Sequence, residues 1–461
     1  IVIGAGTNGL VCAGLLARAG QRVLLLEQAA QAGGLAAARP FAEGFSAPVA
    51  HHAASFQPAV AKALDLESHG LRWASQPAML SSLPGNGRVV SIAGTQAHGV
   101  SEADREAWAT LAAQLDRFSD ALAPFWLKTM PRLARGGMRE MTTFGKLAWG
   151  LRRLGKKEFR EFLRVFSLPA RDLADETLDN EALKALLAWD GLIGSRMAPR
   201  SPNNAVPMLL YRRSGRAVSG SGNLLTALTA AAEQAGVTIR TGARVKRLRI
   251  EADTRGERVT GVVLADGETL GAGRVISSLD PKTTFIDLVG VSHLEIGFTN
   301  RIARVRARGL VAKVHLALDA LPVFEGLEQP RGRLLDAPSL DAIEFAFDAS
   351  KYGEVPARPV LEFCLPSLDD PALAPAGKHV LSAHIMYITG DRKDGWDDAA
   401  RAALLDTVLA RLERLAPGLR EQVVASELLL PGDLEQRYGL AGGHWHHGEF
   451  ALDQMLMMRP T

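Results

Sequence analysis

The chain opens with IVIGAGTNGL, residues 1–10, which combines an apolar strand, a glycine-rich turn and the start of a helix. Gly4, Gly6 and Gly9 form the pattern G-x-G-x-x-G. In this pattern the first glycine allows a tight turn, the second lets a pyrophosphate approach the backbone, and the third lets helix pack on strand. The phosphates would lie at the positive end of the helix dipole. The stretch therefore predicts a dinucleotide-binding site, and Asn8 in the same turn is included among its residues.

A strand that ends in an acidic residue follows this turn. The helix expected over residues 8–19 ends before Gly20, and QRVLLLE then forms an apolar strand that ends at Glu27, 18 residues past Gly9. A carboxylate at this distance accepts hydrogen bonds from a ribose 2′-hydroxyl and repels a 2′-phosphate, which argues against NADP. We therefore predict that Glu27 and the adjacent Gln28 contact the cofactor.

A pair of glycines, Gly33 and Gly34, comes six residues after Glu27. It allows a second stretch of backbone to come close to the cofactor. The complete pattern of GAGTNG, LLLEQ and AGG resembles the FAD-binding amine-oxidase and phytoene-desaturase superfamily. This resemblance implies that the cofactor is FAD.

A second stretch with the features of a nucleotide-binding domain spans residues 222–290. A helix over 224–235 would end at Gly236, and VTIR would add a parallel strand. RVKRLRI and RVTGVVLADG alternate as antiparallel strands, and Asp266-Gly267 predicts a hairpin turn. The stretch resembles the second FAD-binding segment of phytoene-desaturase-related proteins.

The resemblance also implies individual residue roles. In that superfamily the backbone of a valine holds the adenine side of FAD, and Val245 in GARVKRL matches it. Ser277, in RVISSLDP, matches the strand that returns beneath the flavin. The two ends of the chain, residues 3–20 and 439–460, resemble the pyridine nucleotide-disulphide oxidoreductase domain-containing protein 2 group, so the resemblance covers nearly the whole chain.

These observations predict an α/β fold. A Rossmann-like FAD-binding domain is built from the discontinuous segments 1–92 and 214–291, with a helical cap over 93–213 and a mixed sheet-plus-helix substrate domain over 292–439. Residues 440–461 would begin a flavin-proximal segment. Members of the superfamily continue from there with a glycine-rich strand and helix that close over the cofactor, and this sequence stops before such a segment. Two expectations stay open: the segment follows in the native protein and the enzyme interpretation stands, or it is missing and FAD binding is weakened, as in a pseudo-enzyme.

The cap region carries an uneven charge. Ser101 and the acids after it predict the start of a helix whose apolar residues recur at helical spacing. Residues 128–164 then contain 11 Lys or Arg against 3 Glu, interleaved with large apolar residues. Two interpretations are open: a helix that lies on an anionic membrane surface, or an amphipathic helix that packs on the core with its cations in water.

Histidines are the best candidates for proton transfer. His51 and His52 fall where the superfamily runs its chain from the cofactor glycines toward the flavin ring. A second cluster comprises His444, His446, His447 and Glu449. By pattern alone this cluster indicates a metal site, but ligands so adjacent cannot all point inward from a strand, so no metal is expected. His52 and His447 are therefore the predicted catalytic residues, as proton donor or acceptor, against the alternative that they are structural.

Composition excludes several function classes. The 461-residue chain is 47% hydrophobic and 22% charged with a net charge of +3, which predicts a globular protein with a large core and no nucleic-acid partner. Its only cysteines, Cys12 and Cys364, lie far apart in sequence, whereas a flavin disulphide reductase needs a close redox pair. Two unpaired cysteines also fit a reducing compartment, so we predict a cytoplasmic protein, with peripheral membrane contact under the first interpretation above.

The combined prediction is an FAD-dependent oxidoreductase that removes hydride from a C–C bond of a hydrophobic small molecule. Three alternatives stay open at this point. An amine oxidase would need paired aromatic residues around the flavin, and aromatics are only 6% of the chain. A flavin-dependent isomerase would require a reductant without consuming it. A non-catalytic protein would use the fold for partner binding, with FAD optional.

Overall fold

The computed structural model describes residues 1–74, 79–83, 85, 88–128, 138–202, 205–254 and 256–454. A four-stranded parallel sheet forms around the N-terminal segment, in the order β10, β2, β1, β14. Its strands are β1 (Val2–Ile3), β2 (Leu24–Leu26), β10 (Thr238–Arg240) and β14 (Ile276–Ser277).

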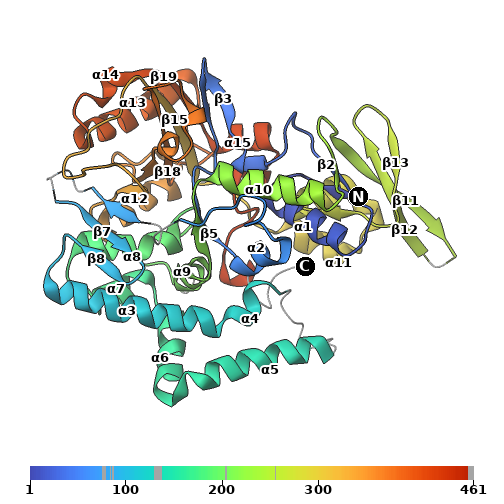
Figure 1. The fold of residues 1–461 in the computed structure, drawn as a ribbon, viewed down its shortest axis with the longest axis horizontal. Helices are drawn as coiled ribbons and strands as arrows, with labels where there is room; N and C mark the ends of the chain where they lie inside the picture. The colour runs from blue at the N-terminus through green and yellow to red at the C-terminus, as the bar shows by residue number, and fades with distance from the viewer. Residues whose placement is uncertain are drawn as a thin grey trace.

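Helices α1 (Thr7–Arg18) and α10 (Ser221–Gln234) cover this sheet and lie near the N-terminus in Figure 1. They pack through buried side chains such as Leu10, Leu25 and Leu228. Because two strands come from the first predicted segment and two from the second, the predicted discontinuous Rossmann-like domain is confirmed.

The second segment forms the predicted hairpins. Strands β11 (Val245–Asp253), β12 (Gly256–Leu264) and β13 (Thr269–Gly271) pair antiparallel in that order. Asp266 accepts a hydrogen bond from the backbone N–H of Glu268 at 2.9 Å in the turn between β12 and β13. Helix α10 ends before Gly236 as predicted, but it begins three residues earlier than predicted.

An eight-stranded sheet forms the second half of the molecule, at the upper left of Figure 1. All neighbours in it are antiparallel except β16 and β6. Its strands in order are β19 (Val423–Leu429), β15 (Val311–Leu318), β18 (His379–Met386), β17 (Leu361–Cys364), β16 (Arg333–Asp336), β6 (Leu80–Ser82), β7 (Val90–Ala93) and β8 (Gln96–His98). The sheet therefore takes strands from three of the segments into which the sequence was divided.

The two faces of this sheet differ in chemistry. Leu316, Phe363 and Ile385 lie in the apolar core that includes side chains of α13 (Asp398–Leu415). Side chains alternate between the faces of a strand, so the intervening residues of β15, β17 and β18 lie on the opposite face. Six of those residues are polar or reactive, and all six are buried: Lys313, His315, Glu362, Cys364, Ser382 and His384.

Helix α13 has a side-chain cap at its N-terminus, where its first residue is Asp398. The Asp397 side chain accepts a hydrogen bond from the backbone N–H of Ala400 and so caps the helix at this point.

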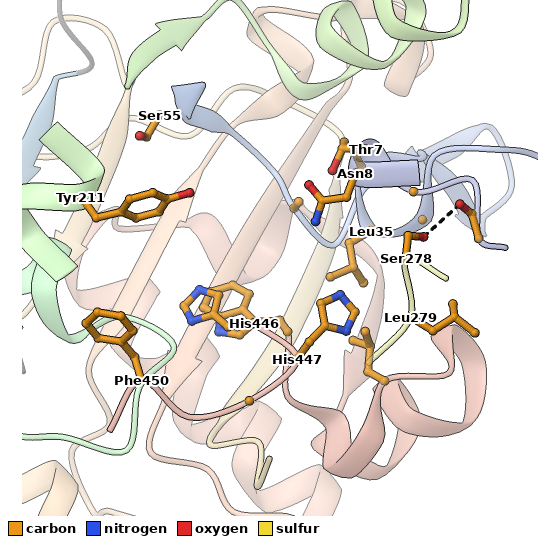
Figure 2. A pocket seen from close by; sticks show the side chains of 18 of the residues that line it. Thr7, Asn8, Leu35, Ser55, Tyr211, Ser278, Leu279, His446, His447 and Phe450 are labelled. Carbon is orange, nitrogen blue, oxygen red and sulfur yellow. Dashed lines mark hydrogen bonds between the residues drawn. The ribbon is translucent and has the colours of Figure 1, made fainter. Parts of the chain in front are cut away.

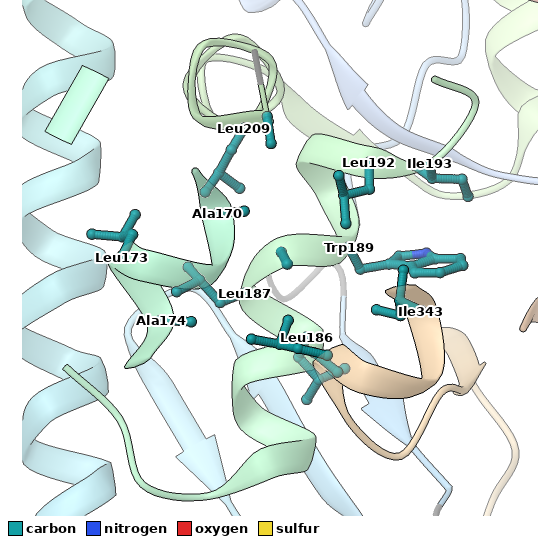
Figure 3. Packing of buried hydrophobic residues seen from close by; sticks show 14 of the residues in the cluster. Ala170, Leu173, Ala174, Leu186, Leu187, Trp189, Leu192, Ile193, Leu209 and Ile343 are labelled. Atoms are coloured by element: carbon teal, nitrogen blue, oxygen red, sulfur yellow. The ribbon is translucent and has the colours of Figure 1, made fainter. Parts of the chain in front are cut away.

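The predicted helical cap is confirmed. Ser101 accepts a hydrogen bond from the backbone N–H of Asp104 and starts the first cap helix, as predicted. Figure 3 shows how Leu173, Leu186 and Leu209 from three of the helices pack together. The cap helices are α3 (Glu102–Ala121), α4 (Ala123–Trp126), α5 (Met138–Arg153), α6 (Gly155–Ser167), α7 (Ala170–Asp175), α8 (Glu181–Leu192) and α9 (Ala205–Arg213).

Shorter elements connect these layers. They are β3 (Arg39–Ala42), β4 (Phe45–Ala47), β5 (Ala53–Phe56), β9 (Arg216–Val218), α2 (Pro58–Leu64), α11 (Ile296–Ala303), α12 (Leu340–Lys351), α14 (Leu419–Gln422) and α15 (Pro431–Tyr438). His51 and His52 lie between β4 and β5, where the chain crosses from the nucleotide side to the large sheet. Among the described residues, none of the helices combines the length and apolar character needed to span a bilayer.

Candidate functional site

A large cavity, of about 2840 Å³, extends from the glycine-rich turn to the cap. Figure 2 shows its course: Thr7 and Asn8 lie at one end, His446 and His447 in the middle, and Tyr211 with Phe450 at the other end. The cavity thus joins the predicted cofactor site to the cap and to the polar face of the large sheet.

The glycine-rich turn leaves room for a phosphate. A Cβ at Gly6 would meet no atom within 4 Å, and Gly6 lines the cavity. Within the described residues no side chain caps α1, so the N–H groups of its first turn remain available to an anion. Gly9 does not line the cavity: a Cβ there would lie 1.8 Å from the carbonyl oxygen of Gly4, which explains its role in packing helix on strand.

The other predicted cofactor residues surround this turn. Gly4, Asn8, Gln28 and Val245 line the cavity, as do Glu27, Gly33 and Gly34. The Glu27 carboxylate accepts hydrogen bonds from the backbone N–H groups of Ala5 (2.8 Å) and Ala29 (2.9 Å), one on each oxygen. Each oxygen keeps a further lone pair for a ribose hydroxyl.

Ser277 is the exception among these residues. Its hydroxyl hydrogen-bonds the Thr284 hydroxyl at 2.8 Å, and it does not line the cavity. The adjacent Ser278 lines the cavity instead and donates to the carbonyl oxygens of Ile3 and Gly4. Adjacent residues of an extended strand point to opposite faces, so Ser278 faces the cavity and Ser277 faces away from it. The open space at Gly6, the uncapped helix and Glu27 together fit a dinucleotide.

A buried carboxylate organises the polar wall of the cavity. Glu362 of β17 is fully buried, and its Oε2 accepts hydrogen bonds from Arg333 Nε (3.0 Å) and Trp189 Nε1 (2.6 Å). Arg333 Nη2 also lies 2.6 Å from Asp190 Oδ1. Burial alone would raise the pKa of Glu362, but the charge of Arg333 and hydrogen bonds from histidines outweigh it and hold the pKa well below its usual range.

His52 lies against this carboxylate and lines the cavity. Its Nε2 is 2.9 Å from Glu362 Oε1, so it donates to the carboxylate, and Nδ1 is left with a lone pair. Nδ1 has no hydrogen-bond partner among the described residues. Burial lowers the pKa of His52 more than its hydrogen bond to Glu362 raises it, so the ring is neutral near pH 7. A neutral imidazole held by a carboxylate is suited to accept a proton.

A second layer of buried bases lies behind His52. Lys313 donates a hydrogen bond to His51 Nδ1, and burial lowers the pKa of Lys313 to about 7. Burial likewise lowers the pKa of His51 well below its usual value and that of His384 to about 3. His384 Nε2 donates to the carbonyl oxygen of Val49 at 3.1 Å.

One arrangement in the described part of the chain resembles a metal site. His51, Glu362 and His384 place ligand atoms within 4.8 Å of one another. The guanidinium of Arg333 contacts Glu362, and Lys313 hydrogen-bonds His51, so two of the three ligands are already engaged, which disfavours a divalent cation there. The sequence expectation of no metal site remains a prediction.

The C-terminal histidines divide into different roles. His446 and His447 line the cavity, whereas His444 is buried. Burial lowers the pKa of His447, and the negative charge of Asp280 raises it by a smaller amount. Glu449 pairs with Arg306 at 3.1 Å rather than with a histidine, which removes the carboxylate from the ligand set that the pattern suggested.

Several residues of the polar wall do not appear among the sequence-predicted residues: Asp190, Arg212, Lys313, Arg333, Glu362 and His384. Polar residues alternate with apolar ones over part of these strands, as Lys313 and His315 do in VAKVHLAL. The two cysteines are both free, and Cys364 is buried in β17. Burial raises its pKa to about 12, so it is not a reactive thiolate.

Comparison with known proteins identifies the family. The family described as flavin containing amine oxidoreductase matches residues 9–431. Pyridine nucleotide-disulfide oxidoreductase domain-containing protein 2 of Rattus norvegicus is 30% identical over 505 residues, covering 100% of this chain and 86% of that protein. The lycopene-forming phytoene desaturase of a Paracoccus strain is 29% identical over 286 residues, covering 58% of this chain and 52% of that protein.

A solved structure agrees in fold. A putrescine oxidase variant superposes with a TM-score of 0.55 at 16% identity, covering 93% of this chain and 83% of that one. The family match, together with the dinucleotide cradle, supports the predicted cofactor and reaction class. The chain belongs to the flavin containing amine oxidoreductase family and is an FAD-dependent oxidoreductase.

Proposed function

We propose that this protein dehydrogenates a C–C bond of a hydrophobic small molecule, with His52 as the proton acceptor. The observation that carries the proposal is the continuity of one cavity from the glycine cradle, past His52, to an apolar section under the cap. Bound FAD supplies the hydride acceptor in this chemistry. The chain's own residues bind the substrate, exclude water and take up the proton.

The apolar section favours a long hydrophobic substrate. Side chains from the cap line it, and they form a surface that gains free energy by covering apolar groups. The described residues in this section are Leu122, Phe125, Trp126, Leu147, Leu151, Phe162, Leu163, Phe166 and Met208. The similarity to a phytoene desaturase supports the same class of substrate.

His52 has the surroundings of a general base. Formation of a C=C bond removes one hydrogen as hydride and the other as a proton, and the proton needs an acceptor near the reacting carbon. The Nε2 hydrogen bond to Glu362 orients the ring and stabilises the imidazolium that forms when Nδ1 takes the proton. Arg333 and Trp189 hold the carboxylate in place. His447, which also lines the cavity, is the second candidate for proton transfer.

Replacement of His52 by alanine tests this assignment. We expect the rate of flavin bleaching under anaerobic conditions by a hydrophobic substrate to fall by about 10²–10⁴-fold, the usual contribution of general base catalysis. FAD content should be unchanged, because the ring contacts Glu362 rather than the glycine cradle. His98→Ala, at an exposed position of β8, is the matched control and should keep the wild-type rate. A His52→Ala rate equal to that of the control would show that another group accepts the proton.

A protonated amine is a less suitable substrate for this cavity. Arg212 lines it, and among the described residues no carboxylate lies within 4 Å of its guanidinium to neutralise it. Because no carboxylate contacts it in the described chain, the Arg212 guanidinium would repel an ammonium group placed next to it, even though Asp190, Glu362, Arg333 and Arg212 together have no net charge. This charge favours the C–C over the C–N alternative.

We also propose that α5 and α6 contact an anionic membrane surface. These helices project at the lower edge of Figure 1, and they carry exposed apolar side chains, including Met141, Trp149 and Leu163. Lys146, Arg152, Arg153, Lys156, Lys157 and Arg160 are exposed on the same two helices. The part of the predicted basic stretch over residues 129–137 lies outside the described residues. Apolar and basic groups together favour adsorption to anionic lipid.

Vesicle sedimentation tests this contact. We expect the protein to sediment with phosphatidylcholine vesicles that contain phosphatidylserine, less with pure phosphatidylcholine, and less at high salt. Trp149→Ala should weaken binding, whereas Phe345→Ala, another exposed aromatic residue on α12, should not. Equal binding to both vesicle types, or no effect of Trp149→Ala, would contradict the proposal and support the interpretation of a water-exposed amphipathic cap.

A further inference from the structure

Arg212, at the C-terminal end of α9, differs from the arginines beside it. Its Nη2 contacts only the carbonyl oxygen of Ile193 at 3.4 Å and Nε2 of His446 at 3.5 Å, both at the long limit for a hydrogen bond. A guanidinium has five N–H donors, so most of those on Arg212 lack a protein acceptor within the described chain. By contrast, Arg213 lies 2.7 Å from Asp116, and Arg333 contacts two carboxylates. Arg212 therefore has donors free for a ligand.

The carboxylates of Asp190 and Glu362 pair with Arg333 and form no ion pair with Arg212 in the described chain. Asp190 and Glu362 both contact Arg333, and this group together with Arg212 has no net charge when the imidazoles are neutral. Once His52 has accepted a proton, these four residues and His52 together carry one positive charge. A single negative charge on the substrate would balance it and so favour the protonated state of His52.

The charge state of the ligand follows from the same residues. A carboxylate forms a bidentate pair with one guanidinium and carries one negative charge. A phosphate dianion would place two negative charges close to the carboxylate of Asp190. Among the described residues of this group, Arg212 is the one cation without a carboxylate partner that could pair with them. The geometry therefore favours a carboxylate.

We propose that the substrate is an amphiphile whose carboxylate binds Arg212 and whose apolar chain occupies the section of the cavity under the cap. The proposal rests on the proposed function, since it specifies the hydrophobic substrate of that site. It places the carboxylate end of the chain on the same side as His52, because Arg212 and His52 line the same cavity. The substrate class is thus long-chain carboxylic acids rather than hydrocarbons.

The test compares three ligands of equal chain length on the FAD-loaded protein. Dodecanoate, dodecanol and dodecyl phosphate would be titrated, with the change in the flavin absorbance band or the heat of binding as the readout. We expect dodecanoate to bind at least about tenfold more tightly than dodecanol, as for a charge-assisted pair. Arg212→Met should abolish this preference while leaving dodecanol binding unchanged. Arg213→Met, one position along the same helix, should keep the preference.

The outcomes separate this inference from the proposed function. Equal affinity of the acid and the alcohol, or a preference that survives in Arg212→Met, would overturn the carboxylate assignment. Tighter binding of dodecyl phosphate would overturn it in favour of a phosphate ligand. Neither result affects the His52→Ala comparison, since that measures the rate of flavin bleaching and this measures binding without turnover. If no ligand of the three binds, the hydrophobic substrate class itself is wrong and both proposals fail.

Discussion

Replacing Gly6 with valine yields a folded protein that does not retain FAD. In the structure a Cβ at this position points into open space that belongs to the cavity, so the side chain would occupy the volume that the pyrophosphate needs. It would also keep the phosphates away from the free N–H groups at the start of α1. Loss of two such charged hydrogen bonds costs about 3 kcal/mol or more, which weakens binding by at least about a hundredfold.

The fold tolerates this change for a geometric reason. Gly6 has φ −68° and ψ 178°, an extended conformation that any residue adopts, and its Cβ would meet no atom. We expect the Gly6→Val protein to be colourless after purification, with unfolding transitions like those of the wild-type protein without FAD. Gly271→Val is the matched control: its Cβ also meets nothing, but the residue lies on β13 away from the cavity. A yellow Gly6→Val protein with a full complement of FAD would place the pyrophosphate elsewhere.

The nucleotide half of the site could be predicted because its signals are local. Gly4, Gly6 and Gly9 lie within one turn, and Glu27 follows at a spacing set by one helix and one strand. The chemistry of these positions depends on the backbone, which the sequence pattern specifies closely. Ser277 shows the limit of this reasoning, since a difference of one residue in an extended strand moves a side chain to the other face.

The polar wall could not be predicted in the same way. Glu362 and His52 are 310 positions apart in the sequence. They meet because β17 lies beside β18 and the segment between β4 and β5 crosses the same face of the sheet. A lone polar residue in an apolar strand usually faces water. Here the register of β15, β17 and β18 places Lys313, Glu362 and His384 side by side under the cap, where water is excluded. The alternation of polar and apolar residues in parts of these strands, such as Lys313 and His315 in β15, was visible in the sequence. Only the pairing of the strands shows which polar groups meet.

This buried wall makes the protein sensitive to acid. His51, His315 and His384 are each at most 3% exposed, and burial is the largest cause that lowers the pKa of all three in the folded state. In the unfolded chain these imidazoles titrate near pH 6.5. Below that pH the unfolded state binds protons that the folded state does not, so the free energy of unfolding falls as pH falls.

The size of the effect follows from the number of protons. Once the unfolded form is protonated, each imidazole lowers the free energy of unfolding by about 1.4 kcal/mol for each pH unit of acidification. Three imidazoles lower it by about 4 kcal/mol per pH unit. Domains are typically stable by about 5–15 kcal/mol, so we expect cooperative acid unfolding between about pH 4 and 6. Urea midpoints measured from pH 8 to pH 5 with excess FAD should fall gradually from pH 8 to pH 7, because burial lowers the pKa of Lys313 to about 7, and should fall steeply below pH 6.5.

A matched pair of variants assigns this pH dependence to the buried wall. His315 contacts the Ser382 hydroxyl at 3.0 Å and lies on the polar face of β15, whereas His293 pairs with Glu257 at the surface. His315→Asn removes one of these three imidazoles and should reduce the slope below pH 6.5 by about 1.4 kcal/mol per pH unit, even if it lowers stability at every pH. His293→Asn should leave the slope unchanged. Equal slopes in both variants would mean that His315 is protonated in the folded protein, and that the polar wall admits water to β15.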